Sequence, residues 1–418
     1  MHKYAKTDQT RGAVCFTQRT FLPKQQKHIM SRPTLSRFLS AVLFLMSSCD
    51  TRGDKDHPNV KLDINDFEVV DIPITTHELN WYTASHVQVD TGLFWGYNHT
   101  RHACDIFDID LKRHVKSIKL DHDGPQKIAP VGELVAYEEG VILQTMAHLI
   151  FLSKGDSISR KLSYVKILGT DTSKYSPRHQ RVTIGSSERV SYYTKETSVI
   201  IPLFPTDIEP SASEKYYKSL RLARVNVQSG ATTFYNVPYP EELTAGEYFG
   251  SLDYPQLSTK GDSLIYNFPY TSEIFCYNTS TAVLTTYTVA SRNIPENYPV
   301  DISTFKDPMK RLEHRHASAQ YAYVLYDPHR NLFYRSHKGE TEFGKFSDFS
   351  SRYLTIMDEN FNPLVEAKLP EIISPMFAIA PQGLIFQYKA GALDNEEFLR
   401  LAVLNVDTLL RDYSLEID

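Results

Sequence analysis

The sequence predicts an all-β protein, a β-propeller of six blades that follows a lipoprotein signal peptide. Three observations lead to this prediction. Tyr and Phe are abundant, with 26 and 22 copies in 418 residues, and they recur with Val, Ile and Thr in the short runs that favour strands. A pattern of strands and polar turns repeats at roughly 40–50 residues, a period typical of propeller blades. The third observation is a short apolar segment near the amino terminus.

The apolar segment is FLSAVLFLMSSC, residues 38–49. It is too short for a membrane-spanning helix, which needs about 20 apolar residues, and two arginines precede it. A basic start, a short apolar run and small residues before a cleavage point describe an export signal. We therefore assign residues 30–48 to a signal peptide and residues 1–29 to an over-extended start, with Met30 as the initiator.

The apolar segment ends in MSSC, which resembles the bacterial lipobox. In a lipobox the cysteine is lipidated and becomes the first mature residue, so the resemblance implies a lipid anchor at Cys49. It also implies a place in the cell envelope, on the periplasmic or surface face of the outer membrane. Residues 49–61 are polar and charged, which predicts a flexible tether. We assign residues 62–418 to the propeller.

The clearest repeat of the propeller spans residues 257–289. A Lys-Gly-Asp turn leads into a first predicted strand at 263–268, and a second follows at 274–277. A polar turn at 278–281 then precedes a third strand at 282–289. Short antiparallel strands joined by such turns are the unit of a propeller blade.

Looser copies of this repeat begin near residues 90, 138, 195, 321 and 380, which makes six units. One blade cannot bury both of its faces, so neighbouring blades must stack around an axis. Residues 67–74 precede the first copy, and we expect them to supply a strand that completes the last blade. The uneven spacing leaves seven blades open, and a sandwich or a pair of barrels is the alternative architecture.

Two inserts interrupt the repeats, at residues 206–219 and 291–319. Connections as long as the second insert are more often functional than short ones. Within it, Asp307 followed by Pro308 predicts the N-terminus of a short helix, because Asp caps helices and Pro suits the first helical position. The far end of this predicted helix is basic.

The cysteines of the body predict no disulfide. Cys104 and Cys276 lie in comparable strands of distant repeats, too far apart for a bridge, so we expect two free, buried thiols. Neither has metal-ligand spacing with a partner. His99 and His102 precede Cys104, and we interpret them as loop residues. We therefore predict neither a metal nor a cofactor.

Three stretches of the sequence carry a resemblance to a known family. They are the lipobox, KGDSLIYNFPYTSEIFCYN at 260–278 and YVLYDPHRNLFYR at 323–335. Together they resemble a Bacteroidetes family of lipoproteins of unknown function, grouped with six-bladed, TolB-like propellers. The resemblance runs from about residue 67 to the end. It implies a fold and an envelope location, but no catalytic residues.

The charge distribution argues against a nucleic-acid partner. Residues 1–48 contain eight Lys or Arg and one acid, a charge of +7. Because the net charge of the chain is −5, the remainder carries −12. An acidic body repels phosphate backbones. The sequence also lacks a nucleophile elbow, a phosphate-binding P-loop and a dinucleotide-binding fingerprint.

The function we predict is a non-catalytic binding or scaffold module for a glycan, peptide or protein partner. Aromatic and arginine side chains suit such ligands through stacking and directional hydrogen bonds. The candidate ligand-binding residues are Trp81, Trp95, Tyr97, Arg101, Tyr326, Arg330 and Arg335. The first alternative is an envelope carbohydrate-active enzyme, a hydrolase or lyase with its site in the propeller funnel. The second is a structural subunit of an outer-membrane assembly.

Overall fold

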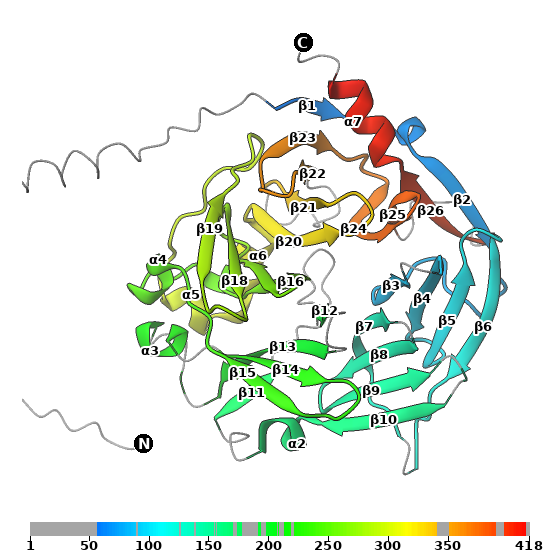
Figure 1. Cartoon of the computed structure of the whole chain (residues 1–418), viewed down its shortest axis with the longest axis horizontal. Helices are drawn as coiled ribbons and strands as arrows, with labels where there is room; N and C mark the ends of the chain where they lie inside the picture. The colour runs from blue at the N-terminus through cyan, green and yellow to red at the C-terminus, as the bar shows by residue number, and fades with distance from the viewer. Residues whose placement is uncertain are drawn as a thin grey trace, which may run out of the picture. The chain divides into compact units, whose positions relative to one another are not determined.

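The computed structural model of the chain describes residues 57–414. Gaps lie at 89–90, 125–126, 138, 154, 156, 170–173, 178–190, 194–197, 207, 209–212, 219–220, 341–350 and 390–396. The predicted signal peptide at 30–48 and Cys49 lie outside the described residues. The strands of the described part form six sheets arranged in a ring (Figure 1), so the prediction of a six-bladed β-propeller is confirmed.

Each blade is an antiparallel sheet built mainly from consecutive hairpins. Blade 1 contains β3 (Ser85–Gln88), β4 (Leu93–Asn98), β5 (Ala103–Asp108) and β6 (Arg113–Lys119). Blade 2 contains β7 (Val131–Tyr137), β8 (Gly140–Thr145), β9 (His148–Ser153) and β10 (Ile158–Ser163). Blade 3 contains β11 (Tyr175–Pro177), β12 (Ser191–Tyr193), β13 (Ser198–Pro205), β14 (Arg221–Asn226) and β15 (Thr232–Tyr235).

The other three blades follow in chain order. Blade 4 contains β16 (Gln256–Lys260), β17 (Ser263–Asn267), β18 (Glu273–Asn278) and β19 (Leu284–Thr288). Blade 5 contains β20 (Gln320–Asp327), β21 (Leu332–Lys338), β22 (Arg352–Met357) and β23 (Pro363–Lys368). Blade 6 contains β24 (Ile373–Ala380), β25 (Gly383–Tyr388) and β26 (Phe398–Leu404). The strands β3, β7, β12, β16, β20 and β24 lie nearest the centre of the ring (Figure 1).

The ring is closed by a strand from the start of the domain. β2 (Glu68–Pro73) pairs antiparallel with β26 and becomes the outer strand of blade 6. Its Val70 and Ile72 are buried against Leu399 of blade 6 and Phe94 of blade 1. The predicted closing strand at 67–74 is therefore present.

The last three residues of the predicted tether at 49–61 form a strand. β1 (Asn59–Lys61) pairs in parallel with β23, on the outer edge of blade 5, and Val60 is buried. The sequence did not indicate this strand, because three residues with alternating polar and apolar character give too weak a pattern. The described domain begins at His57.

Six hydrophobic clusters lie between neighbouring blades, one at each junction. Alternate residues of a strand enter different clusters because successive side chains point to opposite faces of a sheet. On β4, for example, Phe94 packs toward blade 6 and Trp95 toward blade 2. This double-sided burial explains the abundance of aromatic residues in the sequence.

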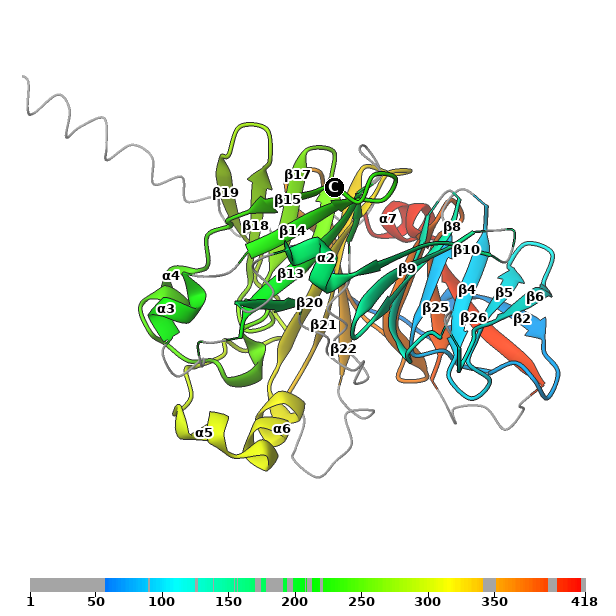
Figure 2. The same cartoon turned by 90° about the horizontal axis from the view of Figure 1, so that it is seen from below.

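The helices are short, and they lie at blade junctions or on one end of the ring. They are α2 (Tyr164–Leu168), α3 (Ser213–Tyr217), α4 (Glu241–Thr244), α5 (Ser303–Lys306), α6 (Pro308–Ala317) and α7 (Val406–Ser414), with 3-10 turns η1 (Ile64–Asp66) and η5 (Gly250–Leu252). Figure 2 shows α5 and α6 on the face of the ring where β20 begins. None of the helices in the described part of the chain has both the length and the apolar character that crossing a membrane requires.

Candidate functional site

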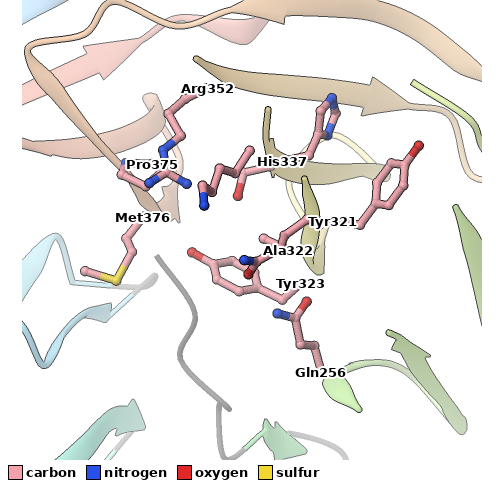
Figure 3. Close-up of a pocket in the computed structure, with 11 residues that line it drawn as sticks. Gln256, Tyr321, Ala322, Tyr323, His337, Arg352, Pro375 and Met376 are labelled. Atoms are coloured by element: carbon pink, nitrogen blue, oxygen red, sulfur yellow. The ribbon is translucent and has the colours of Figure 1, made fainter. Parts of the chain in front are cut away.

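A pocket lies near the centre of the ring, where blades 4, 5 and 6 meet. The first residue of β16, three strands of blade 5 and the middle of β24 supply its eleven described lining residues (Figure 3). The polar ones are Gln256, Gln320, Ser336, His337, Lys338 and Arg352, and the others are Tyr321, Ala322, Tyr323, Pro375 and Met376. None of these eleven residues is acidic. The pocket therefore combines aromatic faces with hydrogen-bonding and positive groups.

Three of the polar side chains form a row across blade 5. In the register of β20, β21 and β22, Gln320 lies opposite Lys338, and Lys338 lies opposite Arg352. Directly opposite residues place their side chains on one face of a sheet, about 5 Å apart at Cβ. The exposed fractions of Gln320, Lys338 and Arg352 are 8%, 6% and 5%. Two positive charges are thus held side by side and shielded from water.

The surroundings of Lys338 disfavour its charge. Burial, and after it the charges of Arg352 and Arg315, lower the pKa of its ammonium group to about 8. Its Nζ donates a hydrogen bond to the backbone carbonyl of His316, at the C-terminal end of α6. The negative end of the α6 dipole offsets part of the free-energy cost of burying the Lys338 charge.

The helix α6 brings further positive groups to this side of the pocket. Asp307 caps its N-terminus by accepting hydrogen bonds from the backbone N–H groups of Met309 (2.9 Å) and Lys310 (3.2 Å), as the Asp-Pro pair predicts. The last turn contains Arg315 and His316. Burial, Lys338 and Arg315 together lower the pKa of His316.

Behind His337 lies a buried carboxylate, Glu366 of β23. Ser291 Oγ and Asn293 Nδ2 donate hydrogen bonds to it at 2.5 Å and 2.7 Å, and His337 Nε2 lies 3.4 Å away. Burial alone would raise the pKa of Glu366, but hydrogen bonds from His337, His57 and Ser291 outweigh it and hold that pKa far below its usual range. Burial lowers the pKa of His337. Every member of this group has a structural partner, so we interpret it as support for the pocket wall.

Arg335 forms a second support beneath the pocket. It is fully buried, its guanidinium lies 4.3 Å from the ring centre of Tyr321, and it donates hydrogen bonds to the carbonyls of Ser272 (2.9 Å) and Val289. Burial lowers its pKa to about 10, so it remains charged at neutral pH. Arg335 thereby orients Tyr321, which does line the pocket.

The structure places the predicted candidates Trp95 and Tyr97 in the core between blades 1 and 2. Trp95 is 1% exposed, and Tyr97 is 4% exposed with its hydroxyl 2.7 Å from His102 Nδ1. Trp81 is half-buried and Arg101 is exposed. None of these four residues lines the pocket.

The other predicted candidates come from the motif at 323–335. Arg330 forms ion pairs with Asp327 and Asp407 and donates to the carbonyl of Pro381, so it joins blade 5 to blade 6. The Tyr326 ring packs under the Lys260 ammonium, 4.7 Å from the ring centre. These contacts assign both residues to packing between blades.

The pocket residues were missed by sequence reasoning. Three of them, Ser336, His337 and Lys338, come directly after the motif at 323–335, and Tyr323 is the first residue of that motif. The signal that could have found them is the pair of basic residues, Lys338 and Arg352, which lie at the facing ends of β21 and β22. Their pairing depends on a strand register that the sequence does not display.

The histidine and cysteine motif of blade 1 is structural. His102 is buried, with Nε2 3.0 Å from the carbonyl of Ile128, while His99 is exposed. Cys104 and Cys276 are free, as predicted, although Cys276 is only partly buried. Within the described residues, no group of three His, Cys, Asp or Glu side chains comes close enough together to hold a metal ion.

The fold and the pocket define this protein as a six-bladed β-propeller with a polar site near the centre of its ring. The model of a domain of unknown function, DUF4221, matches residues 59–368, and the chain belongs to that family. The resemblance to a family of unknown function is therefore confirmed. No protein of known, curated description matches this sequence.

Several solved structures align with this chain over most of its length. A member of the DUF4221 family from Bacteroides vulgatus ATCC 8482 aligns with a TM-score of 0.62 and 15% identity, over 80% of this chain and 96% of that chain. Regucalcin, a calcium-binding protein from Agrobacterium tumefaciens C58, gives 0.43 and 9% over 83% and 95%. A luciferin-regenerating enzyme gives 0.41 and 9% over 81% and 95%. At these identities the likeness is one of fold alone.

Proposed function

We propose that this propeller is a non-catalytic binding module of the cell envelope, with a glycan, peptide or protein as its partner. The observation that carries the proposal is the pocket at blades 4, 5 and 6. Its described lining offers tyrosine rings, amides and positive groups from blades 4 and 5, beside Pro375 and Met376 of blade 6. Such a mixture binds polar ligands by stacking and directional hydrogen bonds.

The composition of the pocket separates this proposal from the enzyme alternative. Glycoside hydrolysis uses a pair of carboxylates that flank the scissile bond. None of the eleven described lining residues is an acid, and the nearby Glu366 is fully buried and occupied by hydrogen bonds. The described residues therefore favour binding over hydrolysis.

We also propose that a lipid on Cys49 holds the propeller to the membrane. The lipobox-like MSSC supports this. The family member from Bacteroides vulgatus is consistent with an origin in the Bacteroidetes. Mass spectrometry of the protein from its native membrane tests the anchor. A lipidated cysteine as the first residue supports it, and an unmodified polypeptide that continues upstream of Cys49 contradicts it.

Glycan and peptide arrays test the binding function. The wild-type protein should bind a defined subset of ligands. Met376→Trp should abolish that binding, because the indole would fill the pocket that Met376 lines. Met146→Trp is the matched control, since Met146 is 77% exposed on blade 2.

Three results would contradict the proposal. The first is binding that Met376→Trp leaves unchanged, and the second is no binding on either array. The third is the release of shorter saccharides from a bound glycan, detected by mass spectrometry, which would make the protein an enzyme.

A further inference from the structure

The second insert, residues 291–319, exposes apolar side chains that the packing of the blades does not use. Four of the eleven large hydrophobic residues exposed in the described part of the chain lie within it. Their exposed fractions are 75% for Tyr298, 37% for Ile302, 63% for Met309 and 43% for Leu312. We call these four residues the insert face. Apolar side chains gathered on a surface mark sites of contact with proteins or membranes.

The packing of α6 directs its part of the insert face outward. A Cβ added to Gly250 of η5 would lie 2.5 Å from Nδ1 of His314, so α6 packs against η5 on its His314 side. At 3.6 residues per turn, Met309 and Leu312 lie about 140° and 160° around the helix from His314. Surface helices normally direct their apolar side toward the core, whereas α6 exposes it. Figure 2 shows α5 and α6 projecting from one end of the ring.

The loop before α5 holds Tyr298 in place. The Nδ2 of Asn297 donates hydrogen bonds to the carbonyls of Tyr270 (3.2 Å) and Ala319 (3.1 Å). The next residue, Tyr298, is therefore presented to solvent by a backbone that is fixed to blade 4 and to the end of the insert. Tyrosine is favoured at the boundary between a membrane and water, because its ring is apolar and its hydroxyl is polar.

The charge of α5 and α6 is opposite in sign to that of the whole body. Residues 303–317 contain four Lys or Arg and two acids, a charge of +2, and with Asp301 included the charge is still +1. The chain from Cys49 onward carries −12. Lys306 and Lys310 are exposed on these helices. An anionic surface repels the body and attracts these lysines, so it favours an orientation with the insert face toward it.

The start of the described domain lies at the base of the insert. Nδ2 of Asn293 donates a hydrogen bond to the side chain of Asn59 at 3.3 Å. Nε2 of His57 lies 3.5 Å from Glu366, which accepts a hydrogen bond from the same Asn293. Cys49 is eight residues before His57, a span of at most about 29 Å. A membrane that holds a lipid on Cys49 therefore lies within reach of the insert.

We infer that the insert face lies on the surface of an anionic lipid bilayer, with its apolar side chains among the headgroups. This inference rests on the proposed lipid at Cys49 and adds an orientation to it. A helix with apolar side chains on one side and lysines beside them lies in the plane of such a surface. The lipid limits the distance of the propeller from the membrane, and the insert face determines which end of the ring turns toward it.

A photoreactive lipid tests this contact. The lipidated full chain is reconstituted into vesicles of phosphatidylethanolamine and phosphatidylglycerol that contain a phospholipid with a diazirine in its acyl chain. Light couples this lipid to adjacent side chains, and mass spectrometry maps the adducts. We expect about fivefold more adducts on residues 298–312 than around Leu111 and Val283, which are exposed in turns of blades 1 and 4. Equal labelling of these segments, or none on the insert, would overturn the inference.

Variants of the insert face test its residues. Met309→Ser combined with Leu312→Ser should lower the adducts on residues 298–312 about fivefold or more. Leu111→Ser combined with Val283→Ser is the matched control and should leave those adducts unchanged. All four positions are exposed, so both double variants should fold, and circular dichroism checks this. Unchanged labelling in the first double variant would overturn the inference.

The lipid composition tests the charge. Vesicles of phosphatidylcholine, which carries no net charge, should give about half as many adducts on the insert or fewer, because they do not attract Lys306 and Lys310. Equal labelling in the two kinds of vesicle would overturn the choice of an anionic surface.

This inference and the proposed anchor fail in different ways. If Cys49 carries a lipid but the insert carries no adducts, the anchor stands and the inference falls. A crosslink from the insert to an envelope protein, in place of lipid adducts, has the same meaning. If Cys49 carries no lipid, the anchor falls. The inference then falls with it, unless the full chain still floats with anionic vesicles and is labelled on the insert.

Discussion

The hydroxyl of Ser291 donates a hydrogen bond of 2.5 Å to the carboxylate of Glu366, 75 residues away in the chain. Ser291 opens the long insert that contains α5 and α6, and Glu366 lies on β23, opposite Asn59 of β1. One buried carboxylate therefore joins the insert, the outer strands of blade 5 and, through His337, the wall of the pocket.

Replacing this carboxylate should destabilise the domain. Glu366→Gln keeps the shape of the side chain, but it replaces one acceptor oxygen with an NH2 group, which then faces groups that donate. We expect the free energy of unfolding to fall by about 1.5–3 kcal/mol, the range for hydrogen bonds to a charged group. Glu68→Gln, on an exposed residue of β2, should stay within about 0.5 kcal/mol of the wild type. Urea unfolding of both variants measures the difference, and equal effects would contradict the role given to Glu366.

The lowered pKa of Lys338 predicts a pH dependence. Its pKa is about 8 in the folded protein, against about 10.4 when unfolded, so the unfolded state holds the proton more tightly between these values. The free energy of unfolding must then rise with pH in that window, and below pH 8 the full cost of the charge is present.

Thermal unfolding of the wild type and Lys338→Met between pH 7 and 10 checks this. The wild type should gain about 2 kcal/mol relative to the variant as pH rises. The control pair, wild type and Lys119→Met on an exposed residue of β6, should show a constant difference. A constant difference for Lys338→Met as well would mean that its ammonium is not perturbed.

Gly96 on β4 should not tolerate a side chain. A Cβ at this position would overlap the ring of Tyr82, whose hydroxyl is held by Asp105 at 2.7 Å. We expect Gly96→Ala to cost about 1–3 kcal/mol, because a packed ring must shift. Gly132→Ala is the control, since the nearest atom to its added Cβ is 3.8 Å away. Similar midpoints of urea unfolding for the two variants would contradict this packing.

The strand β2 should be required for a stable ring. A fragment that begins at residue 75 lacks β2 and the buried side chains of Val70 and Ile72, whose burial is worth about 3–6 kcal/mol. That is a large part of the stability of a typical domain, so we expect a much lower melting temperature or no cooperative transition. A fragment that begins at His57 should melt as the full chain does. Calorimetry compares them, and equal melting temperatures would show that blade 6 does not need β2.

Much of the fold could be predicted because its signals are local. The strands of blade 4 lie within two residues of their predicted bounds, since glycine and asparagine turns separate them in the sequence. The cap at Asp307 and the closing strand β2 were also predicted from neighbouring residues. The parallel strand β1 was missed, because its three residues of alternating polar and apolar character give too weak a pattern.

The candidate site was harder to predict, for a physical reason. The type of a residue does not reveal its location: an aromatic or arginine residue can lie between two blades, as Trp95 does, or on a surface. What makes Lys338 and Arg352 unusual is their register across β21 and β22, which is a property of strand pairing. Only the structure brings the two residues together.

The order of β1 and β2 along the chain has a mechanical consequence. Because β1 comes first, a pull on the residues before His57 reaches blade 5 before it reaches the strand that closes the ring. The short parallel ladder between β1 and β23 would carry that force in shear. The seam between β2 and β26 would carry none until this ladder gave way. A propeller held by its amino terminus can therefore bear tension without being drawn open at its seam.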